Sequence, residues 1–110
     1  MSAIVVLCTC PDDAVADRIA GVLVEERLAA CVNRVPGVAS TYRWKDEIHR
    51  DSECLLLIKS TSERFDALRE RIVALHPYEV PEVLALPVEA GSVSYLAWIE
   101  AAVRPTTRGA

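Results

Sequence analysis

Thiols and imidazoles are the side chains of this 110-residue chain whose spacing is most suited to chemistry. Cys8 and Cys10 are two residues apart, and His76 directly precedes Pro77. Thiolate sulfur is a soft ligand that suits copper, and neutral imidazole binds copper and zinc. In a continuous strand Cys8 and Cys10 would share one face and could hold a soft metal ion, although Pro11 predicts that the strand ends by Cys10. The alternative is structural: each Cys is a small core residue, and His76 ends a helix by bonding a nearby carbonyl.

The remaining cysteines and histidine give weaker indications. Cys31 lies in the apolar run AACVN and Cys54 in the apolar centre of a strand, and both positions are typical of core residues. His49 is interpreted as a solvated surface residue. The N-terminus shows no pattern of a signal peptide, so we expect reduced thiols and a cytoplasmic location.

A second group combines aromatic and charged residues at strand ends and in a proline-bounded loop: Trp44, Lys59, Tyr78, Glu79 and Glu82. One interpretation is structural, with Lys59 paired to a Glu and the aromatic rings serving as packing anchors. The other is a small-ligand pocket between subunits. The four glycines are too dispersed for a phosphate-binding loop, and no Ser-His-Asp arrangement is evident, so we do not expect an enzyme.

The first half of the chain shows the periodicities of strand, helix and strand. Residues 3–9 form a β-branched run that predicts a strand buried on both faces. Asp12 is placed to cap a helix with its carboxylate. Residues 29–44 predict a long strand that bends at Pro36-Gly37, and Lys45-Asp46 then predicts a hairpin turn.

The second half of the chain repeats the strand and helix pattern. Residues 47–59 predict the returning strand of the hairpin, and Ser60 with Glu63 matches a capping box for a second helix. His76-Pro77 ends that helix because the residue before proline is disfavoured in the α region. Residues 83–88 predict a last strand, and a final helix follows Gly91-Ser92.

The order β-α-β-β-α-β with a terminal helix predicts an α+β, ferredoxin-like fold with a long central hairpin and one antiparallel sheet. Right-handed crossovers place both main helices on one face of that sheet. We expect one domain over residues 1–103 and a disordered tail over 104–110.

Composition and charge exclude some classes of partner. The formal net charge is -4 and the isoelectric point is about 5.1, which argues against a nucleic-acid binder. No apolar run reaches the length of a membrane span, so we expect no membrane contact.

The strands predict an oligomer because they are apolar on both faces. Leu55 and Leu57 alternate with Cys54, Leu56 and Ile58, so both sides of that strand are hydrophobic. The last helix could cover part of the second face, whereas a partner subunit could cover all of it. The overhanging hairpin also leaves unpaired edges that a neighbour could pair.

Several stretches together resemble the CutA divalent-cation-tolerance family: VVLCTCPDD, ERLAACVNRVPGVASTYRWKDEI, LLLIK, LHPYEVPEVLALPV and YLAWI. They run in the family's order over residues 5–99. The resemblance implies a ferredoxin-like fold, a homotrimer built by sheet-edge pairing and a distant likeness to the PII signalling proteins. It also implies a response to divalent metal ions, with copper binding and no established catalytic reaction.

The family pattern assigns copper to the Cys of VLCT and to a His-His pair before Pro-Tyr. Cys8 matches the Cys and His76 matches the second His, but Leu75 occupies the place of the first. The resemblance also places Cys31 near a pocket, as a reactive or metal-touching thiol.

Three functions follow. The first is a copper-binding or metal-tolerance homotrimer. The second is a PII-like sensing trimer that binds an organic anion around Lys59, Tyr78 and Glu82. The third is a structural trimer without a ligand.

Overall fold

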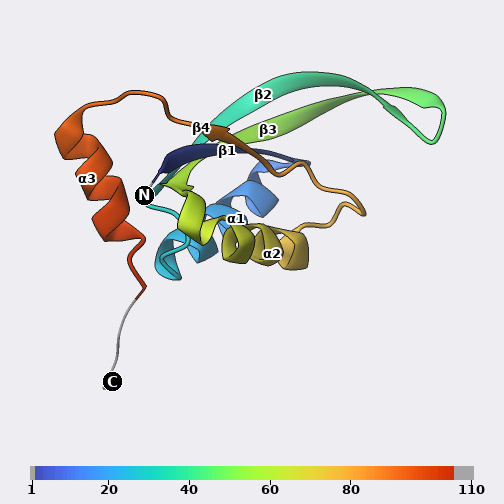
Figure 1. Cartoon of the computed structure of the whole chain (residues 1–110). Coiled ribbons are helices and arrows are strands. Elements are labelled where there is room, and N and C mark those ends of the chain that lie inside the picture. The colour runs from blue at the N-terminus through green and yellow to red at the C-terminus, as the bar shows by residue number, and fades with distance from the viewer. Residues whose placement is uncertain (1, 106–110) are drawn as a thin grey trace.

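A four-stranded antiparallel sheet with helices against it forms the computed structural model, which describes residues 2–105 (Figure 1). The strands lie in the order β2-β3-β1-β4, and every neighbouring pair is antiparallel. The two longer helices, α1 and α2, cover the same face (Figure 1). The predicted ferredoxin-like order is therefore confirmed. The elements are β1 (Ala3–Cys10), α1 (Asp13–Glu25), β2 (Cys31–Trp44), β3 (Glu47–Thr61), α2 (Phe65–Leu75), β4 (Leu84–Pro87) and α3 (Val93–Ala102).

The hydrophobic core lies between the sheet and the helices α1 and α2. Alternate residues of β1 point into it, and Val6, Cys8 and Cys10 are fully buried there. Strand β1 continues to Cys10, one residue beyond the predicted end, because Cys10 still pairs with Cys54 of β3. The predicted cap is confirmed, since the Asp12 carboxylate accepts a 2.9 Å hydrogen bond from the backbone N–H of Val15.

Strands β2 and β3 form the predicted long hairpin. Lys45 and Asp46 form its turn, and both have positive φ (50° and 65°), as in the two-residue turns that match strand twist. The predicted bend at Pro36-Gly37 is a shift of register, with Gly37 at φ 70°. Strand β1 pairs with β3 only as far as Cys54. Among the described residues, 38–44 and 47–53 therefore pair only with each other, and we call them the ribbon. The ribbon projects beyond the rest of the sheet (Figure 1).

The entry to α2 differs from the predicted capping box. Ser60 is a fully buried residue of β3 whose hydroxyl donates to the carbonyl of Leu28 at 2.7 Å, so it caps no helix. A 3₁₀ turn over Ser62–Arg64 leads into α2 instead. The predicted helix end is confirmed, because His76 has an extended backbone (φ -80°, ψ 137°) before Pro77.

In the C-terminal part, the last strand is shorter than predicted, and the last helix begins where it was predicted. Strand β4 spans Leu84–Pro87, and α3 follows Ser92. Ile99 and Val103 anchor α3 against the rest of the chain, while Val93 is 83% exposed. Of the tail predicted to be disordered, residues 106–110 lie outside the described residues.

The sheet face opposite α1 and α2 is apolar, as the sequence predicts. Leu84 is paired with Leu7 and Leu86 with Val5, and directly paired residues project to the same face. Leu84 is 56% and Leu86 50% exposed, so much of this second face is open to solvent in the single chain. Between residues 2 and 105, no helix has the length and hydrophobicity needed to cross a membrane.

Candidate functional site

Cys8, Cys10 and His76 come together at one end of β1. Their candidate ligand atoms all lie within 4.8 Å of one another, and we call the three residues the Cys/His cluster. Both cysteines are fully buried and His76 is 7% exposed. Strand β1 places the two thiols on one face, and the end of α2 places the imidazole beside them. Cys31 does not join the cluster, because it lies at the start of β2, where its thiol is 3.9 Å from Asn33 Oδ1.

Both ring nitrogens of His76 have hydrogen-bond partners. Nε2 lies 2.8 Å from the carbonyl oxygen of Thr9, and the backbone N–H of Tyr78 donates to Nδ1 at 3.2 Å. A carbonyl can only accept a hydrogen bond, so Nε2 carries the ring proton and Nδ1 carries the lone pair. The unprotonated ring nitrogen, Nδ1, therefore already has its lone pair engaged by the Tyr78 N–H.

The two thiols of the cluster are electrostatically unequal. Their mutual hydrogen bond raises the pKa of Cys8, burial raises it further, and the same bond lowers the pKa of Cys10. Cys10 is therefore the more acidic of the two thiols. A metal ion that displaces both protons would relieve this inequality, since metal binding to thiols releases protons.

The donor set of the cluster fits a soft metal ion. Two sulfurs and one imidazole nitrogen are the ligand types that suit copper, above all Cu(I). Leu75 stands where the resemblance implies another His, and its half-buried side chain packs against the core. Three donor residues are nevertheless present, because Cys10 lies beside Cys8 and His76.

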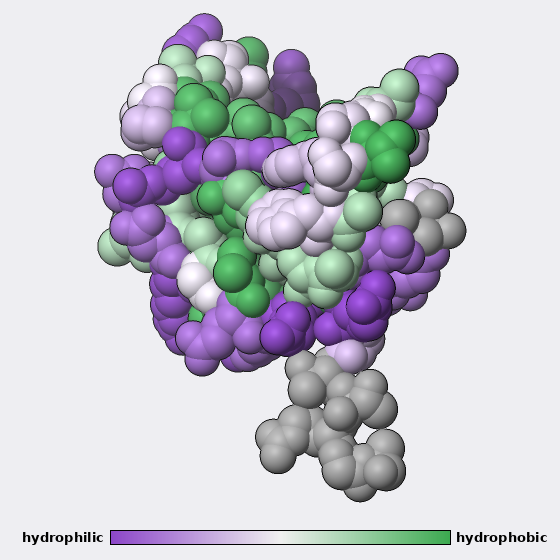
Figure 2. Space-filling view, turned by 90° about the vertical axis from the view of Figure 1, so that its left-hand side faces the viewer, coloured by the Kyte–Doolittle hydropathy of each residue, from purple (hydrophilic) through white to green (hydrophobic). Residues whose placement is uncertain are grey.

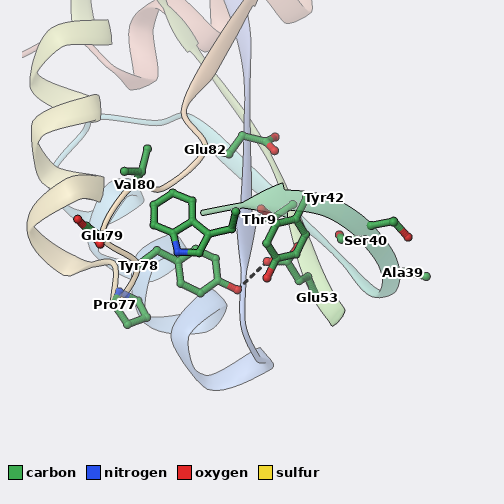
Figure 3. Close-up of a pocket in the computed structure, with 12 residues that line it drawn as sticks. Thr9, Ala39, Ser40, Tyr42, Glu53, Pro77, Tyr78, Glu79, Val80 and Glu82 are labelled. Atoms are coloured by element: carbon green, nitrogen blue, oxygen red, sulfur yellow. Dashed lines mark hydrogen bonds between the residues drawn. The ribbon is translucent and has the colours of Figure 1, made fainter. Parts of the chain in front are cut away.

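A cavity of about 750 Å³ adjoins the cluster between the ribbon and the loop that follows α2 (Figure 3). Of the five predicted pocket residues it includes Trp44, Tyr78, Glu79 and Glu82. Lys59 lies outside it, because that residue pairs with Cys31 near the opposite end of β3 and its ammonium donates to Asn33. The lining residues are Thr9, Ala39, Ser40, Thr41, Tyr42, Trp44, Glu53, Pro77, Tyr78, Glu79, Val80 and Glu82.

Glu53 is the charged residue of the cavity lining that sequence reasoning missed. It is 8% exposed, and the hydroxyl of Tyr78 donates to its Oε2 at 2.6 Å (Figure 3). Burial and this bond raise the pKa of Tyr78, and burial with the Glu53 charge raises the pKa of Glu82. None of the described residues that line the cavity is Lys or Arg. The cavity is therefore aromatic and acidic.

Thr9 and Tyr78 belong to both features. Each lines the cavity, and each makes a backbone hydrogen bond to the His76 ring. Thr9 and Tyr78 thus lie between the cluster and the cavity and contact both.

Comparison with known proteins identifies similar chains. The model of the family "CutA1 divalent ion tolerance protein" matches residues 4–102. The "Divalent-cation tolerance protein CutA" of Thermus thermophilus is 57% identical over 95 residues, which cover 86% of this chain and 92% of that protein. The mouse "Protein CutA" is 53% identical over 91 residues, which cover 83% of this chain and 51% of the mouse protein. The chain thus spans about half the length of the mouse relative.

Solved structures agree with this result. The divalent cation tolerance protein of Thermus thermophilus superposes with a TM-score of 0.88 at 55% sequence identity. The superposition covers 90% of this chain and 96% of the Thermus chain. CutA1 from Oryza sativa gives a TM-score of 0.92 at 43% identity, with 96% and 97% covered. A structure from Archaeoglobus fulgidus described as a periplasmic divalent cation tolerance protein gives 0.90 at 35% identity, with 93% and 99% covered.

Proposed function

The chain belongs to the CutA1 divalent ion tolerance family, and we propose that it binds a soft metal ion, copper first, at the Cys/His cluster. The observation that carries the proposal is the convergence of three buried donor atoms within 4.8 Å. The proposed role is binding and tolerance, without a catalytic step.

Each residue of the cluster has a distinct part in this proposal. Cys10 offers the thiolate that forms more readily, and Cys8 follows once the metal ion displaces its proton. His76 offers Nδ1, since Nε2–H is bonded to the Thr9 carbonyl. A bound ion would supply Lewis acidity, and the burial of these donors would keep water away from it.

A competition titration tests the proposal. The reduced protein is titrated with Cu(I), and in parallel with Cu(II), against a chelator of known affinity. We expect one ion per chain, and a loss of affinity of at least about tenfold in each of Cys8→Ser, Cys10→Ser and His76→Ala. Cys31→Ser and His49→Ala are the matched controls, because neither residue belongs to the cluster.

Two results would count against the proposal. One is a wild-type protein that takes no copper from the chelator. The other is equal binding by the cluster variants and their controls.

We propose that the chain acts as a homotrimer. Within residues 2–105 the edge strands β2 and β4 each pair on one side only, and the second face exposes Leu84 and Leu86. On the side that carries α3, hydrophobic residues gather within a hydrophilic rim (Figure 2). Pairing between edges and burial of this surface would remove both liabilities. Sedimentation equilibrium should give three times the chain mass of 12.1 kDa. A cytoplasmic location stays a prediction.

The cavity supports a second candidate function, a PII-like module that binds a small molecule. The sequence favoured an organic anion, but without Lys59 the lining favours an organic cation: its Glu side chains attract positive charge, and its aromatic rings bind cations through their faces. Lys45 already places its ammonium 5.7 Å from the Trp44 ring centroid. Choline should raise the melting temperature, and its uncharged analogue 3,3-dimethylbutan-1-ol should not. Equal shifts would reject this function.

A further inference from the structure

We propose that Tyr78 is a positioning residue that opposes metal binding at His76 and so couples the Cys/His cluster to the cavity. The inference rests on the proposed metal site. It goes beyond that site because it assigns a role to a residue that offers no ligand to the ion.

The first step concerns the lone pair of His76. Nδ1 accepts a hydrogen bond from the Tyr78 N–H, so a metal ion at Nδ1 must displace that N–H. Moving the ring proton to Nδ1 would be no solution. The Nε2 lone pair would then face the carbonyl oxygen of Thr9 at 2.8 Å, and two acceptors would oppose each other.

The second step concerns how firmly Tyr78 is held. Its hydroxyl donates to Glu53 Oε2 at 2.6 Å across the cavity (Figure 3). The centroid of its ring lies 4.6 Å from the centroid of the His76 ring. The acceptor is a carboxylate that is 8% exposed, and hydrogen bonds to charged acceptors are the stronger kind. The side chain therefore holds the backbone N–H of Tyr78 against Nδ1.

The consequence is a linkage between two sites. An occupant of the cavity that fixes Tyr78 on Glu53 weakens metal binding, and a metal ion that displaces the Tyr78 N–H loosens the cavity wall. Such a coupling is reciprocal in free energy. Tyr78 is suited to it because it contacts the cluster through its backbone and the cavity through its hydroxyl.

Affinity measurements test the coupling. Tyr78→Phe removes the hydroxyl, and Glu53→Gln replaces its charged acceptor with a neutral amide. In both variants Cu(I) should therefore bind roughly two- to tenfold more tightly than in the wild type. Tyr42→Phe is the matched control. Its hydroxyl donates to Asp51 and its side chain lines the same cavity. Among the described residues, the hydrogen-bond partners of the His76 ring are Thr9 and Tyr78, not Tyr42. Unchanged or weaker affinity in both test variants would overturn the inference.

Nuclear magnetic resonance gives a readout that does not depend on affinity. In the metal-free protein, the ¹⁵N shifts of the His76 ring should show a protonated Nε2 and an accepting Nδ1. Cu(I) has a closed shell, so spectra can also be recorded with the metal bound. The Tyr78 amide should then shift and exchange faster with solvent.

The outcomes separate the two proposals. If copper binding needs Cys8, Cys10 and His76 but leaves the Tyr78 amide unchanged, the coupling is wrong and the metal site stands. If binding is insensitive to those three residues, the metal site is wrong and the coupling fails with it.

Discussion

Glu82 and Glu53 are carboxylates at the wall of one cavity whose described lining has no cation to balance them. Burial raises the pKa of Glu82, and the charge of Glu53 raises it further. A carboxyl group with a raised pKa in the folded state binds a proton more readily when folded than when unfolded. Stability therefore falls as the pH rises from the ordinary range of a Glu through this raised pKa.

The variant Glu82→Gln should consequently melt at a higher temperature than the wild type at pH 7. The difference should shrink as the pH falls toward about 4, where the ordinary Glu side chain is half protonated. Calorimetry between pH 4 and pH 8 measures it, with Glu79→Gln, an exposed residue of the same loop, as the control. A difference that stays constant with pH would show that ionisation of Glu82 does not oppose folding.

Residue types together with the family resemblance supplied the candidates for this site. Cys8, Cys10 and His76 were candidates because their atoms bind soft metals, but their meeting depends on contacts across 67 positions of sequence, as between His76 and Thr9. Glu53 gave no signal. Its burial depends on Tyr78, 25 positions away, and a carboxylate on a hairpin is ordinarily expected in solvent.

At the scale of elements, the register shift of β2 depends on Gly37. Its φ of 70° lies in the left-handed region, which residues with a Cβ adopt at a cost of about 1–2 kcal/mol. A Cβ at this position would meet no atom within 4 Å, so the backbone alone sets the cost. Gly21 lies in α1 with equally open surroundings.

Alanine at these two glycines should therefore have opposite effects. Gly37→Ala should lower the free energy of unfolding by about 1–2 kcal/mol. Gly21→Ala should raise it by about 0.5–1 kcal/mol, because alanine is the better helix former. Urea denaturation of both variants against the wild type measures the difference. The same sign for both would contradict the assignment of the bulge.

Local sequence patterns predicted the elements, and they failed where contact with a residue distant in the sequence determines the structure. Hydrophobic periodicity predicted each strand and helix, and Pro77 predicted the end of α2. Ser60 matched a capping box by spacing, but its hydroxyl bonds the carbonyl of Leu28, a residue 32 positions away. Pro11 suggested an early end of β1, but pairing with Cys54 carries the strand to Cys10.

At the scale of the whole molecule, the apolar second face is the feature that calls for a partner. Leu86 projects from β4 beside Val5 and is half exposed in the single chain. Burying an unpaired charge in an interface is strongly unfavourable. The same charge on an exposed surface has little effect.

Leu86→Lys should accordingly reduce the mass of the assembly toward that of one chain. Val24→Lys on α1, where Val24 is 44% exposed on the helical side, should leave the mass unchanged. Sedimentation equilibrium measures both variants. An undiminished mass in Leu86→Lys would remove the second face from the interface.

The ribbon has one more consequence. Its two strands pair only with each other, and an isolated two-stranded hairpin is marginally stable in water. In a lone chain its amide hydrogens should therefore exchange with solvent readily, whereas neighbours packed on it would protect them. Once exchange is limited by separation of the chains, its rate in the ribbon equals the rate of dissociation. The ribbon amides would then report the lifetime of the assembly without any added label.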